Sequence, residues 1–205
     1  MTDDNEEMDH NEEHLSFYHE LGLAITQWAH VEFAIARIVG ACFGQRHAKR
    51  AAAGFLSIEN VRSKLQFADQ ILAKRRMPKI ERTNWAGLVE RAGKLAQKRN
   101  SLAHSWVLND LSCNPGRRVM LLSTRPSTKA AKQSYPGALC VRDVAGYRIE
   151  FVALMRDLEN FDCRLSGREE QYPEFPEQQR RPPTLANLRR TIYAYARRPP
   201  QSSQA

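Results

Sequence analysis

The sequence lacks the features of a membrane-spanning or exported chain. Its 205 residues contain no apolar run close to the ~18–20 residues that cross a bilayer. The first residues, MTDDNEEMDHNEEH, are acidic and have no apolar centre, so they do not resemble a signal or transit peptide. Hydrophobic residues still make up 42% of the chain, enough to build a core. We therefore expect a soluble, cytoplasmic protein.

Cysteine is scarce and scattered. The four cysteines are Cys42, Cys113, Cys140 and Cys163, and they form no CxxC pair and no cluster with histidine. This spacing predicts neither a zinc site nor a disulfide framework. We expect four small buried side chains in a reducing compartment.

Several enzyme signatures are also missing. The sequence has no Walker A loop, no GxGxxG, no G-x-S-x-G and no H-E-x-x-H. Their absence argues against a P-loop NTPase, a dinucleotide-dependent dehydrogenase, a serine hydrolase and a zincin protease. We therefore expect no cofactor and no metal site.

Positive charge is absent from one end and abundant elsewhere. The first twenty residues hold eight acids and no Lys or Arg. The other 185 residues hold all 31 Lys and Arg against 15 acids, a net charge of +16. A body this basic favours a polyanionic partner such as nucleic acid, although a solvated basic surface would look the same.

Apolar residues at helical spacing dominate the middle of the chain. Steps of three and four predict long helices over 13–43, 80–108 and 146–165 and a helix starting at Ser57, with a weaker short helix over 46–55. The tryptophans at 28, 85 and 106 all fall on these apolar faces, so we expect them in the core. The pattern predicts an all-α fold, a bundle of four to five helices.

Two apolar segments read as strands rather than helices. Asn114-Pro115-Gly116 is a turn signal, and the segments 117–123 and 138–144 are rich in Val, Leu and Met. We expect them to pair as a β-hairpin, inserted at about 115–145, before the last long helix. A long polar loop would join them and offer basic side chains to RNA, namely Arg125, Lys129 and Lys132.

Composition divides the chain into three parts. Residues 1–12 read as a disordered acidic arm, 13–167 as the helical domain, and 168–205 as a tail rich in Pro and Arg. A short basic helix over 184–197 is predicted within this tail. Arginine contacts phosphate and tyrosine stacks on bases, so the tail is a second candidate RNA-binding segment. Its candidate residues are Arg189, Arg190 and Tyr193.

Two charged residues interrupt the apolar stripes. Glu32 takes a core-facing place in the first helix, and Arg99 takes one in the fourth. A buried charge is costly unless it is paired. We therefore expect Glu32 and Arg99 either to face each other or to line one polar cleft.

Asn100 and His104 add chemistry beside Arg99. They are four residues apart and so share a helix face, next to the face that bears Arg99. Arg99 and His104 diverge by roughly 140° around the axis, so both can border one groove without touching. An imidazole can move protons near neutral pH, and a guanidinium can hold a phosphate. This set suits RNA cleavage without a metal ion.

The segment Arg99-Asn100-Ser101-Leu102-Ala103-His104 resembles the motif of the HEPN family. That family is an all-α bundle with an Arg-x4–6-His motif near the end of a bundle helix, often with Asn after the Arg. Residues 25–32, ITQWAHVE, are also similar to bacterial HEPN-like proteins, in which a Trp and a Glu on the first helix precede an R-N-x-x-A-H segment. The resemblance covers about residues 14–167.

The resemblance implies a metal-independent endoribonuclease, typically a homodimer, in which two copies of the motif form one composite cleft. Arg99, Asn100 and His104 would form the catalytic set, with Glu32 as a supporting residue. Many relatives are toxins or defence effectors, which implies an antitoxin or regulatory partner. Other relatives only bind RNA or proteins, so the alternative is a non-catalytic module in which Arg99 pairs structurally with Glu32.

Overall fold

The computed structural model describes residues 9–122, 135, 137–173, 175–176, 179, 181–188 and 190. Its helices are α1 (His10–Ala41), α2 (Gln45–Leu56), α3 (Val61–Ala73), α4 (Lys79–His104) and α5 (Val141–Leu165), and its strands are β1 (Trp106–Asn109) and β2 (Val119–Leu122). The predicted all-α bundle with a hairpin before the last long helix is confirmed. Within the described part of the chain, no helix is both long and apolar enough to cross a membrane.

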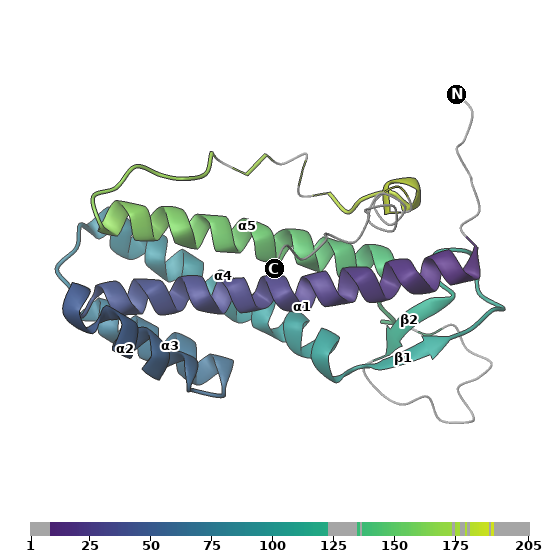
Figure 1. The fold of residues 1–205 in the computed structure, drawn as a ribbon, viewed down its shortest axis with the longest axis horizontal. Coiled ribbons are helices and arrows are strands. Elements are labelled where there is room, and N and C mark those ends of the chain that lie inside the picture. The colour runs from purple at the N-terminus through teal and green to yellow at the C-terminus, as the bar shows by residue number, and fades with distance from the viewer. Residues whose placement is uncertain are drawn as a thin grey trace, which may run out of the picture.

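Three long helices form the body of the bundle. Figure 1 shows α1 and α5 side by side, with α4 behind them and the α2–α3 pair at the end where α1 finishes. Trp28 from α1 packs edge-on against Phe151 from α5, and Trp85 from α4 stacks on Phe161. Both tryptophans are buried, as their helical spacing predicts.

The hairpin uses different strands from those expected. β2 pairs antiparallel with β1, from Trp106 opposite Leu122 to Asn109 opposite Val119. The fourth helix therefore ends at His104 instead of continuing to 108. Trp106 lies on β1 and is 54% exposed, so the prediction that places it in the core is wrong.

The expected second strand, 138–144, is mostly helical. Leu139 forms an isolated bridge with Leu121, but α5 already begins at Val141. Val141, Val144 and Ala145 are buried at helical spacing, and the Asp143 carboxylate accepts a hydrogen bond from the Cys140 backbone N–H at 2.8 Å. Because this capping interaction starts a helix, the Val-rich segment packs as its first turn.

Glu13, at the start of α1, anchors the hairpin to the bundle. Its carboxylate is fully buried and accepts hydrogen bonds from the backbone N–H groups of Gly116, Arg118 and Val119, at 2.8, 2.6 and 3.1 Å. A carboxylate with three such donors is well satisfied despite its burial. Gly116, in the predicted turn, has φ 83° and so suits glycine.

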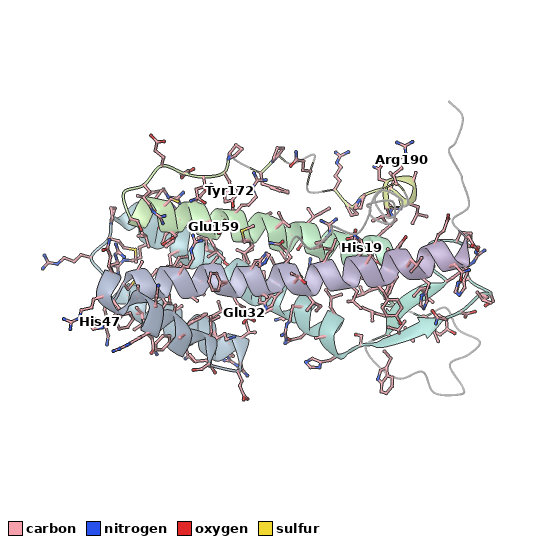
Figure 2. The ribbon with its side chains drawn as sticks, viewed as in Figure 1. His19, Glu32, His47, Glu159, Tyr172 and Arg190 are labelled. Carbon is pink, nitrogen blue, oxygen red and sulfur yellow. The ribbon has the colours of Figure 1, made fainter. Side chains whose placement is uncertain are left out.

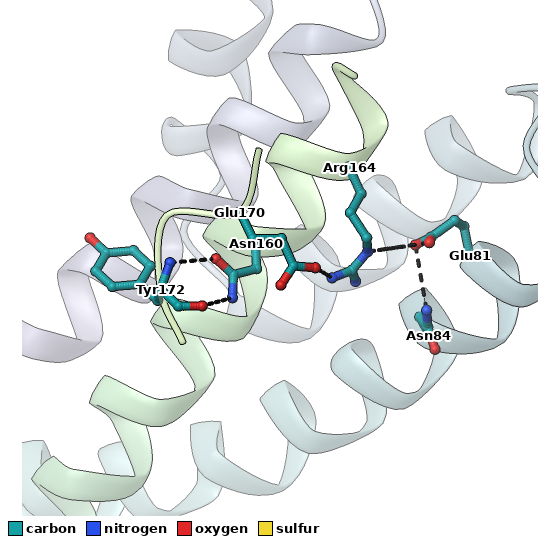
Figure 3. A network of polar contacts seen from close by, with 6 residues as sticks. All are labelled: Glu81, Asn84, Asn160, Arg164, Glu170 and Tyr172. Carbon is teal, nitrogen blue, oxygen red and sulfur yellow. Dashed lines mark hydrogen bonds and ion pairs between the residues drawn. The ribbon is translucent and has the colours of Figure 1, made fainter. Parts of the chain in front are cut away.

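The segment after α5 returns along the bundle rather than leaving it. Asn160 exchanges two hydrogen bonds with the backbone of Tyr172, and the guanidinium of Arg156 lies over the rings of Tyr172 and Phe175. Figure 3 shows Tyr172 held by Asn160 beside the neighbouring contacts of Arg164. Leu188, farther along, is buried. This part of the predicted tail is therefore packed against the helical domain.

Candidate functional site

A cleft of about 760 Å³ lies between the start of α3 and the second half of α4. We call it the α3–α4 cleft. Its volume falls in the range of ~300–1,000 Å³ that is typical of ligand sites. The α4 side includes Arg99, Asn100 and His104, together with Glu90, Lys94 and Gln97. The structure thus brings the three predicted motif residues to one cleft.

Helical geometry explains this placement. Leu95, Ala96 and Leu102 are buried and fix the inner face of α4. Arg99 is half-buried beside that face, whereas Asn100 and His104 are exposed. His104 is the last residue of α4, because Ser105 adopts an extended conformation (φ −87°, ψ 157°) that leads into β1. The imidazole therefore stands where the helix ends, at the edge of the cleft.

Few described groups interact with the positive charge of Arg99. Its guanidinium donates one hydrogen bond, from Nη1 to Oδ1 of Asn100, at 3.2 Å. Its Nε atom is buried without a hydrogen-bond partner among the described residues. No described carboxylate forms an ion pair with Arg99. Since a guanidinium offers five donors, most of the capacity of Arg99 is unused.

Glu32 belongs to a different part of the bundle. Its carboxylate accepts a hydrogen bond from Trp28 Nε1 at 2.6 Å and forms an ion pair with Lys64 of α3. Figure 2 places Glu32 on the side of α1 that is nearer α3. The side chains of Lys64 and Glu32 are only 8% and 15% exposed. The predicted pairing of Glu32 with Arg99 is therefore wrong, because Lys64 is the cation that α3 turns toward α1.

The four residues predicted for the catalytic site thus lie in two different places. Arg99, Asn100 and His104 line the α3–α4 cleft, and Glu32 does not. Glu32 supports the site only indirectly, because its ion pair holds α3, which forms the opposite wall.

That opposite wall was not predicted from the sequence. It includes Glu59, Asn60, Arg62 and Leu65. Asn60 caps α3, and its Oδ1 accepts hydrogen bonds from the backbone N–H groups of Arg62 and Ser63, at 2.8 and 3.4 Å. The Asn at the start of an apolar helix was a usable capping signal, but nothing local shows that α3 faces the end of α4.

Charge at the border of the cleft is partly neutralised. Lys94 forms an exposed ion pair with Glu90, one turn earlier on α4, at 2.6 Å. The hydrogen bond from Lys94, together with its positive charge, lowers the pKa of the Glu90 carboxyl below its ordinary value. Lys94 is thus engaged with an acid, in contrast to Arg99.

Most of the predicted RNA-binding residues fall outside the described residues. These are Arg125, Lys129, Lys132, Arg189 and Tyr193. Arg190 is described and is exposed in a short helix that begins at residue 185. Figure 2 shows it beyond the edge of α5, in the segment that returns along the bundle.

The cysteines form no shared site. All four are free, and Cys163 is buried, whereas Cys42, Cys113 and Cys140 are half-buried. The expectation of four buried thiols is therefore right for one residue only. Burial raises the pKa of the Cys140 thiol, whose place at the start of α5 is described above.

Within the described ranges, no group of three or more His, Cys, Asp or Glu is placed to hold a metal ion. The three motif residues bring a guanidinium, an amide and an imidazole to the α3–α4 cleft, beside the carboxylates of Glu59 and Glu90 and the side chains of Arg62 and Lys94. A scan against protein-family models and searches of curated proteins and of solved structures give no match for the chain.

Proposed function

We propose that this protein is a metal-independent endoribonuclease of the HEPN type, with Arg99, Asn100 and His104 as its catalytic set. The observation that carries the proposal is that these three side chains line one open cleft, in which Arg99 has no carboxylate partner among the described residues. An arginine left without an acid is suited to an anionic ligand. The basic charge of the chain favours RNA as that ligand.

The reaction is an internal transesterification. The 2′-oxygen of a ribose attacks the adjacent phosphorus, and the bond from phosphorus to the 5′-oxygen of the next nucleotide breaks. One group removes the 2′-hydroxyl proton, and one protonates the departing 5′-oxygen. The products are a 2′,3′-cyclic phosphate and a 5′-hydroxyl, so neither water nor a cofactor is consumed. His104 supplies proton transfer, and Arg99 stabilises the negative charge of the phosphorane.

Asn100 acts through Arg99. Its amide oxygen accepts the hydrogen bond from Arg99 Nη1, which restricts the rotation of the guanidinium plane. A fixed guanidinium presents two parallel N–H donors to the non-bridging oxygens of a phosphate. The amide N–H groups of Asn100, which make no hydrogen bond with any described residue, can donate to a ribose hydroxyl.

A homodimer completes the proposal. Each chain contributes one His104, whereas the reaction uses both a proton acceptor and a proton donor. Two copies that share a composite cleft supply both imidazoles, as the family resemblance implies. The same resemblance suggests a cytoplasmic toxin or defence effector, controlled by an antitoxin or another regulatory protein.

The test is an RNA cleavage assay in EDTA with folded wild-type protein and two histidine variants. His104→Ala should lower the cleavage rate by about 10²–10⁴-fold, the usual contribution of a general acid or base. His30→Ala is the matched control, because His30 is an exposed histidine of α1 that does not line the cleft. It should cleave like wild type and leave 2′,3′-cyclic phosphate ends.

Two outcomes contradict the proposal. Cleavage that survives His104→Ala, or that stops in EDTA, would remove the assigned mechanism. RNA binding by the wild type without any cleavage would favour the alternative, a non-catalytic RNA-binding module. The version of that alternative in which Arg99 pairs with Glu32 does not agree with the ion pair between Glu32 and Lys64.

A further inference from the structure

Arg62 stands on the wall opposite the proposed catalytic set. It is the second residue of α3, is exposed, and lines the same cleft as Arg99 and His104. Its side chain makes no hydrogen bond or ion pair with any described residue. Lys94, which also lines the cleft, forms an ion pair with Glu90. The two arginines, one from each wall, are therefore the lining cations that no described acid neutralises.

The backbone beneath Arg62 is held at three places. Asn60 caps the helix directly at the Arg62 N–H, Lys64 is tied to Glu32 of α1, and Leu65 is buried in the core. A fixed backbone that carries a guanidinium with no partner among the described residues suits a ligand contact, because binding then costs less conformational entropy. The position of Arg62 relative to α4 is thus set by the fold, and only its side chain must adjust.

We propose that Arg62 is a substrate-binding residue that contacts a phosphate next to the scissile phosphate, so that the cleft takes a single strand of RNA with at least two consecutive phosphates. This inference rests on the proposed function, because it takes Arg99 to hold the scissile phosphate. An RNA strand carries one phosphate per nucleotide, so arginines on opposite walls can each engage one. The cleft volume of about 760 Å³ lies within the range of ~300–1,000 Å³ that is typical of ligand sites, so the cleft has room for a short segment of one strand.

The first experiment measures binding without cleavage. A labelled single-stranded RNA oligonucleotide is titrated into the His104→Ala protein over a series of salt concentrations, and a 2′-O-methyl oligonucleotide is titrated into wild type as a second, uncleavable probe. Arg62→Ala, introduced into either protein, should weaken RNA binding. It should also reduce the magnitude of the slope of log association constant against log salt concentration by about 0.7, which corresponds to the loss of one phosphate contact on a single strand. Arg62→Lys should keep the slope but bind more weakly than wild type, because lysine cannot bind in a bidentate manner.

Arg46→Ala is the matched control, because Arg46 is an exposed arginine of α2 that does not line the cleft. It removes the same charge from the molecule and should leave the salt slope unchanged. If Arg62→Ala and Arg46→Ala show the same affinity and slope, or if neither probe binds, the inference is overturned.

The second experiment separates this inference from the proposed function. A dinucleoside monophosphate has only the scissile phosphate, whereas an oligonucleotide has neighbours. Arg62→Ala should raise KM for the oligonucleotide and leave cleavage of the dinucleoside monophosphate unchanged. Wild type that cleaves both substrates with no effect of Arg62→Ala overturns the inference alone. If Arg62→Ala weakens oligonucleotide binding and reduces its salt dependence, but the wild type cleaves neither substrate, the result overturns the proposed function alone.

Discussion

Glu32 on α1 and Arg99 on α4 both interrupt an apolar helix face, and the bundle surrounds them differently. Glu32 accepts a hydrogen bond from Trp28 and pairs with Lys64 in a nearly closed site. Among the described residues, Arg99 donates a side-chain hydrogen bond to its neighbour Asn100 alone, and it borders an open cleft. A charge on an apolar stripe therefore has two meanings, an internal ion pair or a binding site. The difference lies in whether another element of the fold supplies the opposite charge.

The same comparison applies to the residues that surround each charge. The contacts of Glu32 join α1 to α3 and so hold two helices together. The hydrogen bond of Arg99 stays within α4 and links it to no other described element. Stability and function should therefore be divided between the two sites, and three variants test that division.

The largest effect is expected at the ion pair. Glu32→Ala leaves Lys64 buried without a partner, which should lower the free energy of unfolding by about 3–5 kcal/mol, as measured by urea denaturation. Glu59→Ala, which removes an exposed carboxylate with no ion pair among the described residues, should have little effect. Replacing the pair together, Glu32→Leu with Lys64→Met, should cost less than Glu32→Ala. A loss below about 1 kcal/mol for Glu32→Ala would show that the pair is not structural.

Arg99→Ala should give the reverse pattern. The rate of RNA cleavage should fall by about 10²–10³-fold, the usual result of losing one donor to a developing negative charge. The free energy of unfolding should change by less than about 1 kcal/mol, because no described acid is left unpaired. The two readouts are a cleavage assay and urea denaturation of the same preparation, with Arg46→Ala as the control. A large loss of stability together with unchanged cleavage would reverse the comparison.

The smallest effect is expected from the hydrogen bond between Trp28 and Glu32. Trp28→Phe removes a donor to a partly buried carboxylate and should lower the free energy of unfolding by about 1.5–3 kcal/mol. Trp85→Phe is a close control, because Trp85 is equally buried and bonds Asp69, an exposed acid, at 3.1 Å. Water can replace that lost bond, so Trp85→Phe should cost less. Equal losses in thermal or urea unfolding would show that packing alone accounts for both changes.

Much of the helical framework could be predicted from local sequence. The predicted helices at 13–43, 46–55 and 80–108 match α1, α2 and most of α4, since apolar residues three and four apart share a face in any helix. The hairpin was predicted, but with the wrong strand partner. Strand pairing joins residues distant in sequence. Residues 106–108 continue the apolar spacing of the helix before them, so they were predicted as helix and not as the partner strand.

The sequence predicted the α4 side of the candidate site but not the α3 side. Arg99, Asn100 and His104 lie near the end of one helix, and their spacing alone allows all three to border one groove. Arg62 lies on another helix, and its place across the cleft depends on how α3 packs. The burial of Glu13 was missed for the same reason, because its three backbone donors come from the β1–β2 connection and the first residue of β2, more than a hundred residues away.

The sequence by itself determined the helical spans, the apolar faces and the grouping of Arg, Asn and His near one helix end, because all three depend on contacts within a few turns of one helix. Only the tertiary structure decided that Lys64 neutralises Glu32, that β1 pairs with β2, and that Arg62 faces Arg99 across a cleft. Each of these depends on which distant segments meet in space, and a repeat of three and four residues along one helix carries no information about its neighbours.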